Sequence, residues 1–563
     1  MHHFNILTRR SFLDRSFKTS MAVALATLTD IPFIMKRALA DGNIGLNGKK
    51  LLFIWLRGAN DSLNSVIPIQ DPAYATSRPT TGIGIPKDPG TTYNTANLAS
   101  DFPVNAASSD ATYSYLNAIR LGNGFAAMHP SLKFLAPVYN DGDLALVHRV
   151  AYPKQSRSHF DSQRYWENGN PNNNLIQDGI FYRTIVESQL ANTAAYPITG
   201  ISIQSSLPLI LRGSDAAMTN LTDPTRYDLL GVPNNPLGNV KATNYLNAAN
   251  AFPFPPKLNR ELLQLQYENM SNTLSTFAGI DFSEGGNTFR DPALPGGVVT
   301  DNDTAWAGAN GGDGYYLFPT TNVKNGGWRR PDGTNQANKY VVDPAHQSFF
   351  TNLKAAALIL NQTSAIIAGT ELNGFDTHKA QGGASSNNAS THPQLNKVIG
   401  WSMYALQKFF KRYGRGGTNA LPGATTSWDD VVVVTLSEFG RTTIQNSDVG
   451  TDHAEAGVMF IGGGAIKGYN KGNPYGVFNC GLSDLVPWVP GTSGSMFGVQ
   501  GRYLQRCTDY RSVLGEIIRK HLGASQAQVN RIIPGYVTEP EIAGQRVVAS
   551  SGGTPIIGEV GIL

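Results

Sequence analysis

Five short, almost uninterrupted apolar runs constrain the fold of this chain most strongly. They occupy residues 50–56 (KLLFIWL), 144–150 (LALVHRV), 364–370 (SAIIAGT), 431–436 (VVVVTL) and 458–461 (VMFI). Such runs are typical of strands in a parallel sheet, because helices cover both faces of the sheet and leave no polar side. We therefore predict that each run is a buried strand.

Helical patterns separate these predicted strands. Apolar residues recur at three- and four-residue spacing in 259–273, 347–360, 394–412 and 510–522. Strands that alternate with helices indicate βαβ units and a mainly parallel sheet. The chain has 563 residues, of which 41% are hydrophobic, and is long enough to bury a large core. The predicted fold class is therefore α/β.

The amino terminus has the pattern of an export signal. Residues 8–13 (TRRSFL) contain a twin arginine, an apolar stretch follows at 21–28, and small residues at 38–40 (ALA) suit a peptidase. This order is typical of a twin-arginine signal peptide, here residues 1–40. We expect the twin-arginine translocase to be a partner during export and the mature protein to be periplasmic or extracellular.

Beyond the signal, the sequence predicts one α/β domain over 48–545 and a C-terminal tail over 546–563. Two segments near 83–123 and 279–340 are rich in Gly, Asn, Pro or Thr and lack periodicity. Long segments of this kind in a compact protein are usually binding loops or lids, so we interpret them as loop-rich insertions. After the signal, we find no apolar segment long enough to be a permanent membrane span.

Composition excludes several classes of function. The formal net charge is only +4, from 45 basic and 41 acidic residues, so nucleic acid is not an expected partner. The two cysteines, Cys480 and Cys507, form no CxxC motif, which excludes a zinc ribbon, a thioredoxin motif and c-type haem attachment. They are either a disulfide formed in an oxidising compartment or two buried thiols.

The loops that follow four predicted strands carry carboxylate, imidazole or hydroxyl groups. In chain order these residues are Asp61, Ser158, His159, Asp376, His378, Glu438, Asp452 and His453. Ligands of open α/β sheets bind beyond the carboxyl ends of the strands, so we expect a site there. Asp61 also suits a turn. Asp452 with His453 suits a ligand pair, an aspartate that orients a histidine, or a surface turn.

Asp376 and His378 have the spacing of one face of an extended segment, so both side chains can meet one ion. Glu438 directly follows a buried strand, and a buried carboxylate must be paired, hydrogen-bonded or metal-bound. An ion pair between Glu438 and Arg441 is the alternative to a metal role.

Ser158 begins an S-x-x-D pattern that is typical of a helix N-cap, with Asp161 as the acidic member. A helix N-terminus also favours an anion, and Arg157 beside it suits a phosphate or sulfate oxygen. The chain has no G-x-S-x-G elbow, which disfavours an esterase triad.

Several motifs in fixed order resemble a bacterial family catalogued as domain of unknown function 1501. They are the twin-arginine start, LLFIWLRGANDSLNSVIP (51–68), HPSLKFLAPVYNDGDLALVHRVAYPKQSRSHFDSQRYWENG (129–169), GFDTH (374–378), VVVVTLSEFGRT (431–442), GTDHAEAG (450–457) and DYRSVLGEIIRKHLG (509–523). That family is grouped with the alkaline phosphatase and sulfatase superfamily. The resemblance implies a three-layer sandwich around a central, mostly parallel sheet.

The resemblance also implies two metal ions at the strand ends and hydrolysis of a phosphate or sulfate ester. The implied metal ligands are Asp61, Asp376, His378, Glu438, Asp452 and His453. Ser158, or alternatively Ser156, takes the place of the nucleophile, and Arg157 and Arg441 are candidates to neutralise ester oxygens. Carboxylate and imidazole ligands suit zinc or manganese, with calcium as the alternative.

Two functions follow from these patterns. The first is an exported, metal-dependent hydrolase whose substrate is a small anionic ester. The second is a catalytically inactive scaffold or surface-assembly protein on the same fold. Two departures from the superfamily pattern favour this second function. Only Thr377 separates Asp376 from His378, and Glu438 stands where an Asp-His pair is usual. Carbohydrate binding through Trp166, Trp306 and Trp328 is a third possibility.

Overall fold

The computed structural model describes residues 42–87, 117–224, 272–282, 289–291, 315–319, 343–481, 502–540 and 557–563, with gaps at 189, 192–195, 385, 387 and 505, and it also describes residues 244 and 248. The predicted signal at 1–40 lies outside these residues. So do most of the two predicted insertions and nearly all of the predicted helix at 259–273.

The core of the fold is a nine-stranded sheet in the order β13-β5-β12-β11-β1-β10-β6-β7, with β14 also paired to β5. Its strands are β1 (Lys50–Leu56), β5 (Leu144–Ala151), β6 (Gly200–Ile203), β7 (Thr219–Leu221), β10 (Ile367–Leu372), β11 (Val431–Leu436), β12 (Gly457–Gly462), β13 (Val477–Phe478) and β14 (Thr508–Asp509). The five predicted strands are therefore confirmed, two with the same bounds and three shifted at one or both ends.

The sheet is mixed, which corrects the prediction of a mostly parallel sheet. β12 runs antiparallel to both of its neighbours, β11 and β5. The cause is the connection between β11 and β12, residues 437–456, which contains no helix. A parallel neighbour requires a crossover, usually helical, whereas a chain that turns back without one pairs antiparallel.

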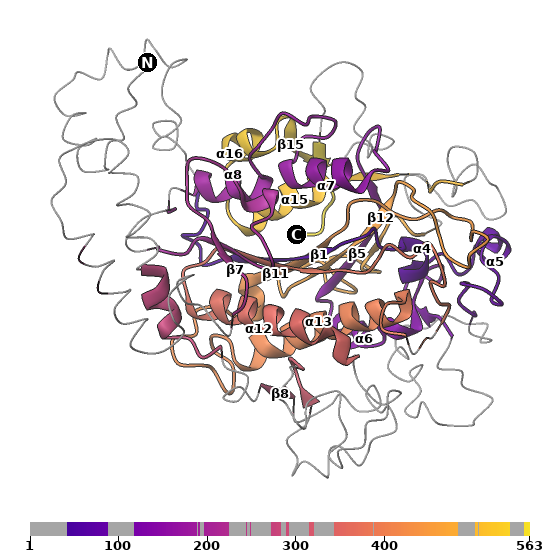
Figure 1. Ribbon diagram of the computed structural model, residues 1–563, viewed down its shortest axis with the longest axis horizontal. Coiled ribbons are helices and arrows are strands. Elements are labelled where there is room, and N and C mark those ends of the chain that lie inside the picture. Colours follow the sequence, from indigo (N-terminus) through magenta and orange to yellow (C-terminus); the bar gives the residue numbers. More distant parts are fainter. Residues whose placement is uncertain are drawn as a thin grey trace.

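Helices cover both faces of the sheet (Figure 1). One face carries α6 (Leu135–Asn140), α12 (Gln347–Gln362) and α13 (His392–Arg412). The other carries α7 (His159–Asn168), α8 (Ile180–Glu187), α15 (Tyr510–Glu516), which continues as a π-helical turn over Ile517–His521, and α16 (Gln526–Ile532). The α/β class is therefore confirmed.

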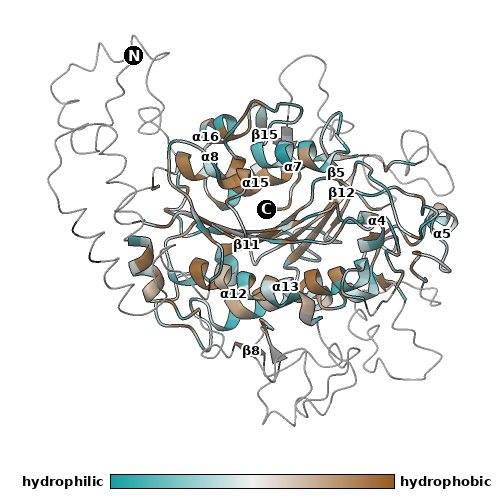
Figure 2. Cartoon of the chain, viewed as in Figure 1, coloured by the Kyte–Doolittle hydropathy of each residue, from teal (hydrophilic) through white to brown (hydrophobic). Residues whose placement is uncertain are grey.

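Both faces of the central strand are apolar, and this explains its uninterrupted apolar sequence. Leu52 and Ile54 of β1 belong to the hydrophobic cluster that includes α12 and α13. Leu51 and Phe53 belong to the cluster on the opposite face, with α7, α8 and α15. Successive residues of a strand point to opposite faces, so β1 needs apolar residues throughout. Figure 2 shows the same distribution as apolar colour along the strands and on the helices that flank them.

Smaller elements surround this core. They include α4 (Ser62–Ser65), α5 (Pro72–Ser77), the three-stranded sheet of β2 (Val66–Ile67), β4 (Ala127–Met128) and β3 (Ile119–Arg120), and the pairs β8 (Arg290–Asp291) with β9 (Tyr315–Tyr316) and β15 (Tyr536–Pro540) with β16 (Ile557–Glu559). Among the described residues, no helix has the length and apolar character that crossing a membrane requires.

Candidate metal centre

Four loops meet at one edge of the nine-stranded sheet. β1, β10 and β11 are parallel to one another, and β5 points the same way because β5 and β11 both pair antiparallel with β12. The loops that follow these strands include residues 57–61, 152–158, 373–381 and 437–456. The edge predicted for a site is therefore the edge where the polar loops gather.

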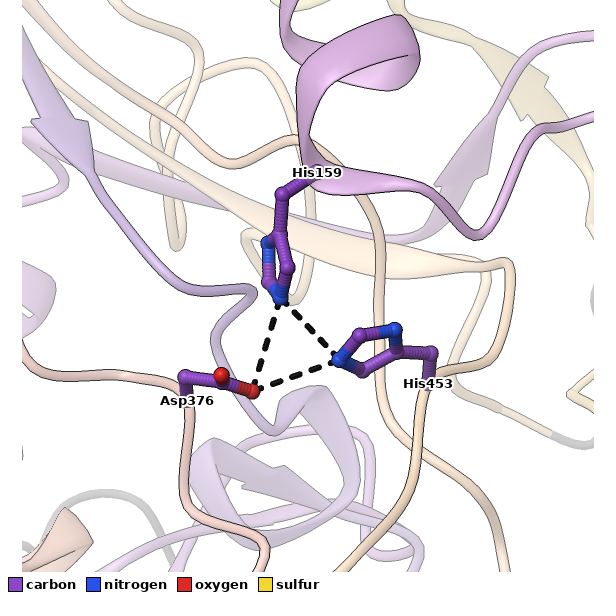
Figure 3. Close-up of side chains that lie close together, drawn as sticks. All are labelled: His159, Asp376 and His453. Carbon is purple, nitrogen blue, oxygen red and sulfur yellow. Dashed lines mark hydrogen bonds and ion pairs between the residues drawn. The ribbon is translucent and has the colours of Figure 1, made fainter.

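Three side chains converge at this edge: Asp376 and His453 from the loops, and His159 from the first position of α7 (Figure 3). His159, Asp376 and His453 each direct one potential ligand atom at the others, and these atoms all lie within 4.8 Å of one another. The Nε2 atoms of His159 and His453 are 3.0 Å apart. Asp376 Oδ1 is 3.5 Å from His159 Nε2 and 3.3 Å from His453 Nε2. This spacing matches the distances between neighbouring ligands of one ion.

A third imidazole, His378, extends the group. Its Nε2 atom lies 2.9 Å from His453 Nε2 and 3.1 Å from Asp376 Oδ1. We call His159, Asp376, His378 and His453 the His/Asp cluster. Three imidazole nitrogens and one carboxylate oxygen are a ligand set that suits zinc and related divalent ions.

The second nitrogen of each ring, Nδ1, contacts a hydrogen-bond acceptor. The pairs are His159 Nδ1 with Glu438 Oε1 at 2.8 Å, His378 Nδ1 with Asp452 Oδ1 at 3.2 Å, and His453 Nδ1 with the carbonyl oxygen of Arg157 at 2.8 Å. Because carboxylates and carbonyls only accept, each Nδ1 must carry the proton. A neutral ring then has its lone pair on Nε2, as in histidines that bind metals.

This assignment directs the Nε2 lone pairs of His159 and His378 at His453 Nε2, and all three Nε2 atoms lie within 3.5 Å of Asp376 Oδ1. Such acceptors repel unless a cation lies among them. Without a metal ion, only a proton can fill this role, by converting one ring to an imidazolium that donates to its neighbours. The donor set and its orientation therefore fit a divalent ion.

Electrostatics distinguish two of the rings. The hydrogen bond that His159 donates to Glu438 is the main cause that raises the pKa of His159. Burial, followed by the charge of Arg441, lowers the pKa of His453. When no metal is bound, a proton shared between these two rings therefore belongs to His159.

The loop over 437–456 is a hairpin, and this shape delivers His453 to the cluster. His453 pairs with Arg441 across the hairpin, and Ala454 N donates to the carbonyl of Gly440 at 3.0 Å. The hairpin returns the chain to the sheet edge, so residues fifteen positions apart, Glu438 and His453, contact opposite nitrogens of the His159 ring.

A glycine in the loop after β1 permits the close approach of the loop after β10. Gly58 has φ +105°, a conformation that L side chains rarely adopt, and a Cβ atom there would lie 2.4 Å from the backbone nitrogen of Asp376. The Gly58 N–H also donates to Glu438 Oε1 at 2.9 Å. This one residue therefore joins the loops that carry Asp376 and Glu438.

Arg441 holds the loops together from within and does not pair with Glu438. Its guanidinium is fully buried and donates to backbone carbonyls of Ala59 and Thr451 at 2.9 and 3.1 Å. It also donates to Asp376 Oδ1 at 2.5 Å. Burial raises the pKa of Asp376, but the hydrogen bond and charge of Arg441 outweigh burial and bring that pKa to about 2. Asp376 is therefore an anion at neutral pH.

The structure does not bring Asp61 into the His/Asp cluster. Asp61 is fully buried, and its Oδ2 atom lies 2.7 Å from Arg78 Nη1 and 2.6 Å from Gln381 Nε2. Burial acts to raise the pKa of Asp61, but Arg78 together with other neighbours lowers it overall. A guanidinium thus already supplies the counter-charge that a metal would supply.

Glu438 and Asp452, both predicted as ligands, lie behind the rings rather than in the cluster. Each accepts from a histidine Nδ1, and Asp452 also pairs through Oδ2 with Arg502 at 2.6 Å. Carboxylates in this place orient the ring and increase the basicity of the ligand nitrogen.

Ser158 is the N-cap of α7, as predicted, because its hydroxyl accepts from Asp161 N at 3.4 Å. Arg157 is exposed, and its guanidinium lies over the ring of Tyr503 at 4.4 Å from the ring centroid. Both residues immediately precede His159, so they border the cluster.

Sequence reasoning placed His159 in a strand-end loop but did not include it among the predicted ligands. In that loop the family resemblance points to the neighbouring residue, Ser158, as the nucleophile. The sequence did contain a signal for His159 as a ligand, because three of the eight histidines outside 1–40 follow predicted strands. In the structure, all three of these histidines belong to the His/Asp cluster.

The tryptophans considered for carbohydrate binding and the two cysteines are either buried or outside the described residues. Trp166 is buried and stacks on Tyr510 with 4.2 Å between ring centroids. Trp306 and Trp328 lie outside the described residues. Cys480 and Cys507 are both buried.

Residues 332–478 match the sequence profile of a family described as "Protein of unknown function (DUF1501)". This match supports assignment to the DUF1501 family. The DUF1501 match includes Asp376, His378 and His453, whereas His159 lies before it. No curated protein and no solved structure matches the chain.

Proposed function

We propose that this protein is a metal-dependent hydrolase of phosphate or sulfate esters, with one divalent ion held by the His/Asp cluster. The observation that carries this proposal is the convergence of three imidazole Nε2 atoms and Asp376 Oδ1, each ring having its other nitrogen bonded to an acceptor. Zinc or manganese suits these ligands, whereas calcium prefers a shell of oxygens.

One ion is proposed rather than the two that the resemblance implies. Asp61 would have to be a ligand of a second ion, but it is enclosed and paired with Arg78. Asp61 Oδ1 has no hydrogen-bond partner in the described part of the chain, but the buried pair of Oδ2 with Arg78 already balances the charge of this carboxylate, and breaking that pair would be costly.

Solvent access favours a catalytic ion over a structural one. The side chains of Asp376 and His378 are 49% and 39% exposed, and those of His159 and His453 are 28% and 26% exposed. Catalytic zinc sites have three protein ligands and an open fourth position, whereas four protein ligands close a structural site. His159, Asp376 and His453 form a group of three ligand atoms within 4.8 Å of one another, so an ion held by these three keeps a position open. The open side of the cluster leaves room for water and an ester oxygen.

A bound divalent ion supplies Lewis-acid polarisation of the ester and of water. The residues of this chain orient the groups around it. Glu438 and Asp452 hold two rings by their Nδ1 atoms, and Arg441 holds Asp376. Exposed Arg157 and half-exposed Arg502 border the cluster and offer positive charge to an anionic ester.

The proposed nucleophile is the Ser158 hydroxyl, next to His159. It attacks the phosphorus or sulfur atom, the bond to the leaving oxygen breaks, and the alcohol leaves with a proton; water then releases the phosphate or sulfate. Direct attack by water is the alternative route to the same products. Arg441 is committed to backbone carbonyls and Asp376, so we assign it a positioning role rather than contact with the ester.

The twin-arginine start supports export of the folded protein to the periplasm or beyond. The twin-arginine route carries folded cargo and so allows a metal to be acquired first. Replacing Arg9 and Arg10 with lysine should retain the protein in the cytoplasm, as measured by cell fractionation. Normal export of this variant would contradict the assignment of the signal.

The experiment that tests the function uses purified full-length mature protein and its Asp376→Asn variant. Elemental analysis should find about one zinc or manganese per chain in the parent protein and much less in the variant. The metal-loaded parent protein should hydrolyse a nitrophenyl phosphate or sulfate, and the variant should not.

Metal without turnover of either ester would favour an exported scaffold whose ion is structural. Absence of metal from the parent protein, even after loading with zinc or manganese, would overturn the proposed metal centre.

A further inference from the structure

We propose that Gln381 is a positioning residue that sets the spacing of the two loops carrying Asp376, His378 and His453. This inference rests on the proposed metal centre, because it concerns how the ligands are held. Gln381 is fully buried and contacts none of the ligand atoms in the hydrogen bonds found. Its action is therefore indirect.

A single oxygen of Gln381 joins the two loops. Gln381 Oε1 accepts from Thr377 Oγ1 at 3.0 Å and from Thr451 Oγ1 at 2.6 Å. Thr377 stands between Asp376 and His378, and Thr451 stands two residues before His453. The loops also meet through a backbone bond from Thr451 N to the Thr377 carbonyl at 3.2 Å.

The other end of the amide fixes its orientation. Gln381 Nε2 donates to Asp61 Oδ2 at 2.6 Å, and a carboxylate can only accept. The amide oxygen must therefore face the two threonine hydroxyls. The position of Asp61 is fixed in turn by Arg78, which donates to it at 2.7 Å and to the carbonyls of Thr442 and Thr443 at 2.6 and 2.9 Å.

These contacts form a continuous chain from Arg78 through Asp61 and Gln381 to both ligand loops. All of its members are buried, and the hydrogen bonds that join them restrict the positions that Gln381 and Asp61 can take. A ligand group must be held to within a fraction of an ångström for tight metal binding. The geometry thus gives Asp61 a role behind the ion, through Gln381, in place of direct ligation.

Gln381→Met tests this role because methionine has nearly the same volume, cannot donate a hydrogen bond, and accepts only weakly through its sulfur. Gln407→Met is the matched control: Gln407 is also buried and donates to carboxylates of Asp141 and Asp143. The readouts are zinc affinity by competition with a chelator and the visible spectrum of the cobalt-substituted protein, which reports ligand geometry.

We expect Gln381→Met to bind zinc about 10- to 100-fold more weakly, as for other groups behind metal ligands, with a shifted cobalt spectrum. Gln407→Met should retain both properties. A folded Gln381→Met protein with the parent's zinc affinity and cobalt spectrum would overturn the proposal.

If Gln381→Met does not fold, the double variant Thr377→Val with Thr451→Val decides the question, because it removes the two hydroxyl donors at constant volume. Weaker zinc binding by this variant supports the proposal, and unchanged binding overturns it. If the parent protein itself binds no zinc, cobalt or manganese, the metal centre fails, and this outcome is distinct from a failure of Gln381 alone.

Discussion

Glu438→Gln is the substitution that tests the metal centre most directly. Glu438 is almost fully buried, and its Oε1 atom is 2.8 Å from His159 Nδ1 and 2.9 Å from Gly58 N. Glutamine has the same shape and keeps one oxygen acceptor, but it removes the negative charge behind the His159 ring. His159 is the cluster residue that Glu438 contacts, so the electrostatic effect on the metal passes through this ring.

The magnitude follows from the hydrogen bond that is weakened. A hydrogen bond to a charged group contributes about 1.5–3 kcal/mol. Because about 1.4 kcal/mol corresponds to a tenfold change in affinity, most of this energy would amount to a loss of about 10- to 100-fold in zinc affinity. We expect Glu438→Gln to lie in this range while the fold is retained.

Zinc affinity should be measured by competition with a chelator, with Glu516→Gln as the matched control. Glu516 is also a buried carboxylate that accepts from backbone nitrogens, here those of Val560 and Gly561, but it is not part of the His/Asp cluster. In metal-free protein, NMR titration should show that the pKa of His159, which Glu438 raises, falls in Glu438→Gln.

The reasoning would be refuted if Glu438→Gln folds and binds zinc as tightly as the parent protein. It would also be refuted if Glu516→Gln weakened zinc binding equally, because the effect would then be one of general stability. An unchanged pKa of His159 in Glu438→Gln would separately contradict the electrostatic part of the argument.

Three further predictions concern the surroundings of the cluster. Arg78→Met should destabilise the protein by about 3–5 kcal/mol in urea unfolding, because it leaves Asp61 buried without its partner; a wild-type unfolding curve would refute this. Ser158→Ala should lower the free energy of unfolding by about 1 kcal/mol, whereas Ser158→Asn should change it little, because asparagine also caps helices. Both variants should lose ester turnover. Turnover by either variant would exclude Ser158 as the nucleophile. With a chelator present, the free energy of unfolding should decrease as the pH falls from about 6.5 towards 4, by about 1.4 kcal/mol per pH unit for each buried neutral histidine. Burial lowers the pKa of these histidines in the folded protein, so the unfolded chain binds more protons over this range. Equal stability at pH 7 and pH 5 would refute this prediction. The pKa values are about 3 for His129 and His148 and about 4 for His392 and His521.

The sequence predicted the strands of the sheet well because burial on both faces leaves a direct trace in composition. Residues 50–56 and 431–436 are strands with the predicted bounds. The direction of β12 could not be predicted in the same way. Its apolar run is the same in either direction, and the direction depends on how the hairpin over 437–456 folds back.

The sequence by itself determined that carboxylates and imidazoles stand in loops after the strands, and that Ser158 caps a helix. Only the tertiary structure decided which of them face one another. It brought His159 into the His/Asp cluster, put Glu438 behind the His159 ring, and paired Asp61 with Arg78. A sequence fixes the residue types in each loop, but which side chains touch depends on angles and distances between loops that are far apart in the chain.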